Sequence, residues 1–418
     1  MMGRWRMNIL FIHQNMPGQF KHLAPMLAAQ PGNRVVFLTQ TVRRSLPGVE
    51  PATYPAPRAS NGAGHHYLRR FEDAVRHGQQ AARAIQQLAR SGFRPDLVIA
   101  HPGWGEALFV KDVLPATPLI LFAELCYRSH GLDIGFDPEE ECTIDTICRT
   151  RIRNAPLLTS LESCDAAVSP TKWQKASHPE AFHDKIDVIF DGIDVDHVRP
   201  RPAAGFTLPD GRVLRRGDPV ITYVARNLEP YRGFRTFMRA IPHIQRLRPD
   251  AEILIIGGDD VSYGSKPATH PNWREAMCAE VPFDPARVHF TGRLGYDAYL
   301  DALAVSAAHV YLTYPFVLSW SCVEAMAMGA LVIASDTGPV REVITDGVNG
   351  ILVDFFDARA LAHTVTRVLP VQAALQPLRD AARATVVEHY ALGDSLAKWQ
   401  RVVERVAGLD RRATHIAA

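Results

Sequence analysis

Residues 221–233 read Ile221-Thr222-Tyr223-Val224-Ala225-Arg226-Asn227-Leu228-Glu229-Pro230-Tyr231-Arg232-Gly233, a buried strand that runs directly into two arginines. Further along, Ser319-Trp320-Ser321-Cys322-Val323-Glu324-Ala325-Met326-Ala327 opens a helix, and the apolar run Leu331–Ser335 follows it. Guanidinium groups beyond a strand end can clamp a diphosphate, because they stay charged and match phosphate oxygens in a bidentate way. A serine-rich helix start offers free backbone N–H groups and a positive dipole end to the same anion. This order of features predicts a phosphate-binding edge of a parallel α/β sheet.

The residue roles follow from this order. Arg226 and Arg232 are the predicted diphosphate clamp, the amides of Ser319 and Trp320 face the same anion, and Glu324 can accept hydrogen bonds from two ribose hydroxyls. Two simpler interpretations stay open. An arginine after a strand is often only solvated, and Glu324 could be a helix-start carboxylate favoured by the dipole.

The same motifs resemble the retaining glycosyltransferases of family 4, which have the two-domain GT-B fold. The resemblance rests on four segments: Val188–Asp194, Val224–Gly233, Glu324–Ser335 and Thr337–Val353. It implies two Rossmann-like domains facing across a cleft, with the donor on the second domain and the acceptor on the first. It also implies a metal-independent, retaining transfer from a UDP- or GDP-sugar to a hydroxyl group, with the nucleotide sugar as substrate and no cofactor.

Under this resemblance the predicted catalytic residues are His101, Arg226 and Arg232. The predicted donor-binding residues are Gly18, Arg226, Arg232, Arg293, Ser319, Trp320 and Glu324. The family's usual second glutamate is replaced by Phe316, so the sequence does not indicate which sugar is selected.

In the first half, Asp96–His101 reads as a buried strand that ends in a glycine-bounded turn. A histidine at the carboxyl end of a parallel strand faces the ligand edge of the sheet, so His101 is predicted to meet the transferred sugar. Gly18 lies in the loop after the first strand, where Gln19 replaces the second glycine of the family's loop. His13 and Glu124 are predicted acceptor-binding residues. A turn histidine and a solvated carboxylate are the alternatives.

The length of the chain and the alternation of its strand and helix patterns predict the domain organisation. A chain of 418 residues exceeds what a single core usually holds. Strand and helix patterns alternate throughout, which is typical of parallel sheets covered by helices. We expect the first domain at 1–198, a Pro-, Arg- and Gly-rich linker at 199–218, the nucleotide-binding domain at 219–390, and a final segment at 391–418 whose helix returns to the first domain.

The expected elements are as follows. In the first half the strands are Asn8–His13, Arg34–Thr39, Asp96–His101, Leu119–Ala123, Ala166–Ser169 and Ile186–Phe190, and the helices are Phe20–Ala29, Tyr67–Ser91, Ala107–Val113, Cys142–Leu161 and Thr171–Ala176. In the second half the strands are Val220–Ala225, Glu252–Gly257, Val288–Thr291, His309–Tyr311 and Leu331–Ala334, and Leu396–Val406 is the returning helix.

Composition limits the other function classes. A net charge of +2 is too near neutral to favour nucleic acid, and six cysteines without metal-ligand spacing favour reduced structural thiols. Short apolar runs predict no membrane span, so we expect a cytoplasmic protein. The arginine-bearing stretch Tyr67–Arg90 could touch the inner face of an anionic membrane, but Glu72 and Asp73 interrupt its charge and favour a solvated helix.

Several alternatives remain. No metal site is expected, and Asp259 and Asp260 are interpreted as turn residues. The expected partners are the sugar donor and a glycan, lipid-linked or small-molecule acceptor. A sugar-nucleotide epimerase or glycan phosphorylase of the same fold, and a non-catalytic nucleotide-sugar-binding protein, are the competing functions.

Overall fold

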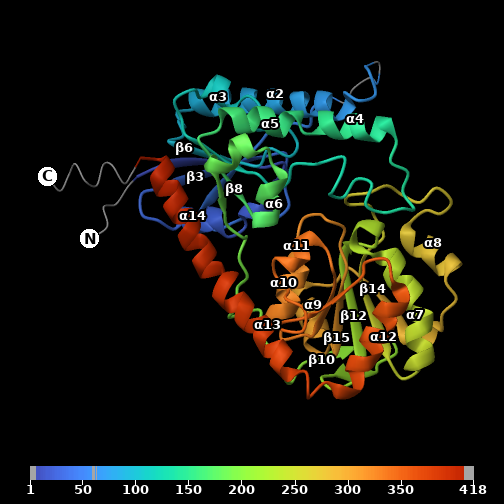
Figure 1. Ribbon diagram of the computed structural model, residues 1–418. Helices are drawn as coiled ribbons and strands as arrows, with labels where there is room; N and C mark the ends of the chain where they lie inside the picture. Colours follow the sequence, from blue (N-terminus) through green and yellow to red (C-terminus); the bar gives the residue numbers. More distant parts are fainter. Residues whose placement is uncertain (1–5, 59–61, 63, 409–418) are drawn as a thin grey trace. The chain divides into compact units, whose positions relative to one another are not determined.

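The computed structural model describes residues 6–58, 62 and 64–408, and the chain divides into two compact units. The first unit runs to Asp191 and includes the chain again from Gly393, whereas the second is continuous from Gly192 to Leu392 (Figure 1). Residues 1–5 of the expected first domain and residues 409–418 of the expected final segment lie outside the described residues.

The first unit is built on a seven-stranded parallel sheet in the order β5-β3-β1-β6-β7-β8-β9. Its strands are β1 (Asn8–Ile12), β3 (Arg34–Thr39), β5 (Val49–Thr53), β6 (Leu97–Ala100), β7 (Leu119–Phe122), β8 (Ala166–Ser169) and β9 (Ile186–Val188), and the short pair β2 (Asn15–Met16) and β4 (Thr41–Val42) lies beside it. Its α-helices are α1 (Leu23–Ala28), α2 (Arg69–Arg90), α3 (Val110–Val113), α4 (Ile144–Arg153), α5 (Ala155–Ser163), α6 (Lys172–Ser177) and α14 (Leu392–Val406), with 3-10 turns at Gly18–Phe20 and Glu180–Lys185.

Both faces of this sheet are buried. Side chains alternate along a strand, so Phe11 of β1 packs in one core with Trp399 of α14, while Leu10 packs in the other with Ile85 of α2. Figure 1 shows α2 on one side of the sheet and α14 on the other. A strand that is apolar on both sides is the expected pattern for a central parallel strand.

The second unit has a six-stranded parallel sheet in the order β14-β13-β12-β15-β16-β17. Its strands are β12 (Val220–Asn227), β13 (Glu252–Gly258), β14 (Val288–Gly292), β15 (Ala308–Tyr311), β16 (Val332–Ser335) and β17 (Ile351–Val353). Its α-helices are α7 (Phe234–Leu247), α8 (Trp273–Glu280), α9 (Tyr296–Ala304), α10 (Trp320–Ala327), α11 (Gly338–Arg341), α12 (Ala358–Val368) and α13 (Gln376–His389), with 3-10 turns at Pro230–Arg232, Pro285–Arg287 and Leu369–Val371. In Figure 1, α9 and α10 lie on one side of β12 and β15, and α7 and α12 lie on the other.

The expected linker at 199–218 is not an open connection. It contains an antiparallel hairpin, β10 (Gly205–Thr207) and β11 (Val213–Arg215), that belongs to the second unit. Phe206 and Leu214 are buried in a core with Leu254 of β13. The apolar residues of the hairpin are separated by Pro, Gly and Arg, so its sequence looks like a loop although its side chains pack.

Two other expectations were wrong in detail. The single helix expected at Cys142–Leu161 is two helices, α4 and α5, because Pro156 in the first turn of α5 cannot continue the hydrogen bonding of α4. Strand β5 was missed because it is an edge strand whose residues are mostly exposed and include Pro51, so it carries no apolar run.

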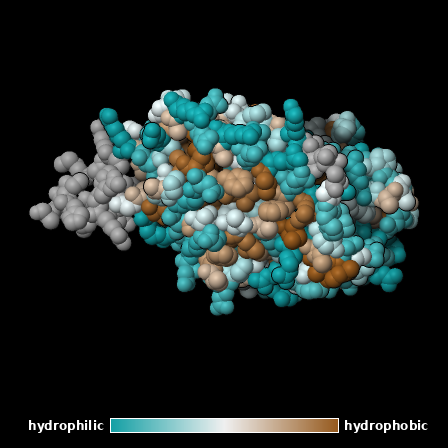
Figure 2. Space-filling model, turned by 90° about the horizontal axis from the view of Figure 1, so that it is seen from above, coloured by the Kyte–Doolittle hydropathy of each residue, from teal (hydrophilic) through white to brown (hydrophobic). Residues whose placement is uncertain are grey.

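Helix α2 lies at the surface of the first unit. Figure 2 shows groups of hydrophobic residues among hydrophilic ones. The exposed large hydrophobics of this unit include Leu68, Val75 of α2 and Ile144 of α4. Among the described residues, no helix is both long and apolar enough to cross a membrane. Contact with a membrane surface therefore stays a prediction.

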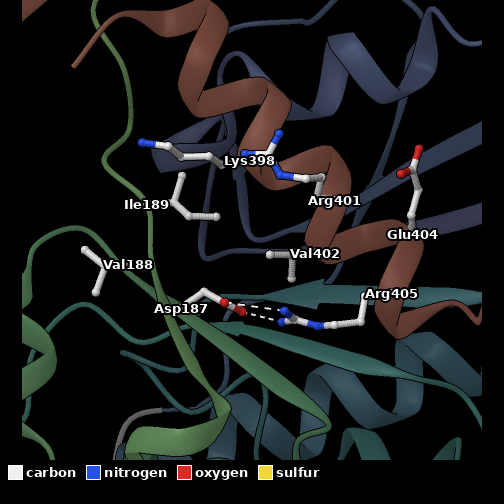
Figure 3. A pocket seen from close by; sticks show the side chains of 8 residues that line it. All are labelled: Asp187, Val188, Ile189, Lys398, Arg401, Val402, Glu404 and Arg405. Atoms are coloured by element: carbon white, nitrogen blue, oxygen red, sulfur yellow. Dashed lines mark hydrogen bonds and ion pairs between the residues drawn. The ribbon is translucent and has the colours of Figure 1, made fainter. Parts of the chain in front are cut away.

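A surface groove of about 540 Å³ lies between β9 and α14 (Figure 3). It is lined by Asp187, Val188, Ile189, Lys398, Arg401, Val402, Glu404 and Arg405, and Arg405 pairs with Asp187. None of the predicted site residues lines it, so groove size alone does not identify the functional site in this chain.

Candidate functional site

The two arginines predicted to clamp a diphosphate have different environments. Arg226, near the end of β12, is exposed, and its guanidinium has no hydrogen bond or ion pair with the described residues. Arg232 is buried, and its Nη1 donates to the Tyr311 hydroxyl (3.1 Å), the Thr313 hydroxyl (2.7 Å) and the Val317 carbonyl (2.9 Å). Arg226 is therefore available to a ligand, whereas Arg232 holds the loop between β15 and α10.

The start of α10 is also partly committed. Ser319 is the N-cap, and its hydroxyl accepts from the Ser321 amide at 3.3 Å. The Ser319 amide itself donates to the Tyr311 hydroxyl at 2.9 Å. Because Tyr311 accepts the hydrogen of this amide here, the predicted contact of the amide with a phosphate stays a prediction. Tyr311 thus links Arg232 to the helix start, and burial raises its pKa to about 12.

Glu324 is buried within α10 and both of its carboxylate oxygens are hydrogen-bonded. Oε1 accepts from the Tyr296 hydroxyl at 2.7 Å, and Oε2 accepts from the Tyr299 hydroxyl at 2.8 Å. The two tyrosines lie three residues apart on α9 and therefore reach the same neighbour. Glu324 was predicted to accept hydrogen bonds from two ribose hydroxyls. In this structure it accepts from two hydroxyls, and both belong to tyrosines of the protein.

Arg293 follows β14 and is exposed. Its Nη2 donates to Asn227 Oδ1 at 2.7 Å and to Asp260 Oδ2 at 3.2 Å, beside the end of β12. Asp259 pairs with Arg274 at 2.9 Å. Both aspartates thus have arginine partners, and the described residues contain no group of three or more His, Cys, Asp or Glu side chains that could hold a metal ion.

Glu229 is a buried carboxylate that the sequence did not single out. It accepts hydrogen bonds from the backbone amides of Ser262, Tyr263 and Gly264, at distances of 3.1 to 3.3 Å. It thereby fixes the loop after β13 against the end of β12. A carboxylate that directly follows a strand end and precedes a proline is the only signal of this in the sequence.

Phe316 lies in an aromatic cluster. Its ring centroid is 5.3 Å from that of Tyr231 and 4.8 Å from that of Tyr263, and the Arg232 guanidinium lies 5.8 Å from its centre. Where the resembled family has a carboxylate, this chain therefore has buried aromatic surface.

The first unit brings its predicted residues together at the carboxyl ends of β1, β6 and β7. The His13 Nε2 donates to Gln19 Oε1 (2.9 Å), and the Gln19 amide donates to Glu124 Oε1 (3.0 Å). This tautomer follows because His13 Nδ1 accepts from the Asn15 amide at 2.9 Å. His101 Nε2 lies 3.8 Å from Glu124 Oε2 and has no hydrogen-bond partner in the described chain.

The loop at Gly18 and the ring of Trp104 pack closely against these two histidines. A Cβ atom at Gly18, whose φ is +51°, would lie 2.4 Å from His13 Nε2, so the loop requires glycine here. The Trp104 ring lies 4.9 Å from both His13 and His101. Trp104 is 37% exposed, which places an aromatic side chain at the edge of the cluster that the sequence did not predict.

Burial and neighbouring charges set the ionisation of this cluster. Burial, and secondarily the nearby His101, lowers the pKa of His13 to about 3, so its imidazole is neutral at physiological pH. Burial would raise the pKa of Glu124, but the interaction with His101 and the hydrogen bond from Gln19 outweigh it, and the net direction is downward. Glu124 therefore stays a carboxylate able to accept hydrogen bonds from hydroxyl groups.

The predicted site residues are thus divided between the two units. His13, Gly18, His101 and Glu124 adjoin one another in the first. Arg226, Arg232, Arg293, Ser319, Trp320 and Glu324 lie in the second, on β12, on α10 and in the loops after β12 and β14. Their roles toward a ligand stay predictions.

Comparison with known proteins identifies both units. Residues 31–198 match the family described as "Glycosyl transferase family 4 group", and residues 218–370 match "Glycosyl transferases group 1". The D-inositol 3-phosphate glycosyltransferase of Streptomyces scabiei is 26% identical over 357 residues, covering 82% of this chain and 76% of that protein.

Solved structures agree on the fold. Sucrose-phosphate synthase from Thermosynechococcus elongatus superposes with a TM-score of 0.71 at 16% identity, covering 97% of this chain and all of that one. HepE of Anabaena in complex with UDP-glucose gives a TM-score of 0.65 at 14% identity, covering 96% and 100%. The two Rossmann-like α/β units are those of the GT-B fold. The chain is an enzyme that belongs to the family 4 group of glycosyltransferases.

Proposed function

We propose that this enzyme transfers a hexosyl group from a UDP- or GDP-sugar to a hydroxyl acceptor, with retention of configuration and without a metal ion. The observation that carries the proposal is Glu324, a buried carboxylate that accepts from two hydroxyl groups at 2.7 and 2.8 Å. A vicinal diol such as a ribose presents the same two donors. HepE, which shares the fold, is described in complex with UDP-glucose.

The departing diphosphate needs positive charge nearby. Arg226, near the end of β12, is exposed and has no partner among the described residues, and Arg293 lies beside the same strand end. Preorganised cations stabilise developing negative charge in the same way that a metal would. Arg232, through Tyr311, positions the loop and the helix start rather than providing its Nη1 to the ligand.

The acceptor hydroxyl is assigned to the cluster of the first unit. Glu124 accepts hydrogen bonds. The His101 Nδ1 accepts from the Gly103 amide at 3.0 Å, so Nε2 carries a hydrogen, and this Nε2 has no hydrogen-bond partner among the described residues. Glu124 can therefore accept the hydrogen of an alcohol, and His101 can donate to its oxygen. Trp104 supplies an aromatic surface against which a sugar or cyclitol ring can pack. Glycans, lipid-linked sugars and small polyols all carry this chemistry.

Phe316 favours one second candidate, a protein that binds nucleotide sugars without transferring them. An aromatic cluster replaces the carboxylate that would contact the donor sugar, so binding of the nucleotide could persist while catalysis is lost. Release of nucleoside diphosphate that depends on an acceptor separates the two functions.

The proposal is tested by incubating the enzyme with UDP- and GDP-sugars and a panel of hydroxyl acceptors, with and without chelator. We expect acceptor-dependent release of nucleoside diphosphate, unchanged by chelator. Proton NMR of the first product should show the donor's anomeric configuration. An inverted anomer would contradict the retaining mechanism, and a strict metal requirement would contradict catalysis by arginines. Interconversion of the sugar nucleotide without acceptor would indicate an epimerase.

A further inference from the structure

The hydrogen bonds to Glu324 are alike in length but unlike in environment. Tyr299 is 8% exposed and lies in the core of the second unit, whereas Tyr296 is 48% exposed at the first turn of α9. The hydroxyl of Tyr296 nevertheless reaches Glu324 Oε1, which belongs to a buried residue of α10. One oxygen of this carboxylate is therefore bonded to a buried side chain, and the other to a side chain that is about half exposed.

The ring of Tyr296 has room to move. Its hydroxyl donates to Glu324, its ring is tilted against that of Tyr299 with centroids 5.9 Å apart, and it stacks on the exposed His197 with centroids 5.7 Å apart. Rotation about its side-chain bonds would keep the ring at the surface and uncover Oε1. The buried Tyr299 has no such freedom, because its ring is enclosed.

The Tyr296 hydroxyl is a donor under all ordinary conditions. Burial, together with the negative charge of Glu324, raises its pKa, and the same two causes raise that of Tyr299. Both hydroxyls therefore keep their hydrogens at neutral pH and donate to the carboxylate. Removing the Tyr296 hydroxyl from Oε1 leaves an acceptor that must be satisfied by another donor.

We propose that Tyr296 competes with the nucleotide at the donor site: its hydroxyl occupies the position on Glu324 Oε1 that a ribose hydroxyl takes when the nucleotide binds. This inference rests on the proposed function. A nucleotide with the ribose diol replaces the lost hydrogen bond when Tyr296 rotates away. A nucleotide without the diol cannot replace it, and so cannot displace the tyrosine without leaving a buried carboxylate oxygen unpaired.

The test is a titration of the full-length protein with UDP and GDP, and with the 2′,3′-dideoxy form of whichever binds. In Tyr296→Phe the competition for Oε1 is gone. We expect the ribose form to bind roughly three- to tenfold more tightly than to the wild type, the effect of one net hydrogen bond. Binding of the dideoxy form should not change, so the preference for the ribose form rises by the same factor.

Two further variants control for the ring and for the hydrogen bond. Tyr296→Ala also lacks the hydroxyl, and should raise the preference in the same direction. Tyr299→Phe removes a bond of nearly the same length from the other oxygen, but in the core, and should not tighten ribose binding. Thermal unfolding of each variant shows that the fold is retained.

An unchanged or lower preference in Tyr296→Phe would overturn the inference, since it would mean that the tyrosine stays on Glu324 in the complex. Failure of the wild type to bind either diphosphate would instead overturn the proposed function, and the inference with it. The two failures are therefore distinguishable.

Discussion

At the scale of single residues, the two arginines of the opening motif have separate tasks. Arg226 is exposed and unpaired among the described residues, and so can act on a ligand without a structural cost. Arg232 is buried and donates to three oxygens of the neighbouring loop and strand. The same residue type six positions apart in one motif is thus exposed to solvent in one case and buried in a structural role in the other.

We predict that Arg226→Ala lowers kcat/KM by roughly 30- to 1000-fold, corresponding to about 2–4 kcal/mol of lost charge stabilisation, without lowering the melting temperature. Arg226→Lys keeps the charge but not the bidentate geometry, and should give an intermediate rate.

Arg232→Ala should instead lower stability by about 2–4 kcal/mol, because buried oxygens lose their donor. Steady-state kinetics and thermal unfolding separate these effects, and unchanged kinetics in Arg226→Ala would remove this arginine from the site.

At the scale of secondary-structure elements, the hairpin β10–β11 is fastened to the sheet by an ionic cluster. Glu252, the first residue of β13, is buried and accepts from Arg212 in the hairpin turn, from Arg287, and from His289 of β14 at 2.7 Å. The cluster and the buried Phe206 and Leu214 explain why a polar stretch becomes an ordered part of the second unit.

This cluster makes stability depend on pH. Burial alone would raise the pKa of Glu252, but the hydrogen bonds from His289, Arg212 and Arg287 outweigh it, so the pKa in the folded state is lowered. A lowered folded-state pKa gives stability that is present above the ordinary glutamate value and is lost as the pH falls through the folded-state value.

We predict that Glu252→Gln lowers the free energy of unfolding by about 1–3 kcal/mol at pH 7, and that the difference from wild type shrinks below about pH 4. Urea unfolding over this pH range measures it. Glu280→Gln is the matched control, since Glu280 pairs with Arg239 at the surface and its loss should cost less than about 1 kcal/mol. A difference that does not depend on pH would contradict the ionic explanation.

At the scale of the whole molecule, the chain crosses between two units that each have their own sheet and core. The ends of the second unit meet: the Ile193 amide donates to the Tyr390 carbonyl and the Leu392 amide donates to the Ile193 carbonyl, both at 2.8 Å. A segment whose ends lie together can be excised without stretching its fold. All predicted donor-binding residues except Gly18 lie within it.

We predict that residues 192–392, expressed alone, unfold cooperatively and bind the nucleoside diphosphate within about threefold of the full chain, without transferring sugar. Circular dichroism measures the unfolding, titration calorimetry measures the affinity for the nucleoside diphosphate, and a glycosyltransferase assay shows whether sugar is transferred. A folded fragment that no longer binds nucleotide would show that the first unit supplies donor contacts.

Local sequence is enough for the parallel α/β architecture, because the apolar runs of β1, β6 and β12 and the caps of α10 are encoded within a few residues. It is also enough to single out Arg226, His101 and Glu324 as predicted site residues. It cannot show that Arg232 points into the protein, that Gln19 bridges His13 to Glu124, or that two tyrosines of α9 hold Glu324. These partners come from separate strands, loops and helices, and which of them meet depends on how the helices pack on the sheet. Hydrophobic periodicity specifies which face of each element is buried, whereas the pairing of polar groups inside it is decided only when the faces come together.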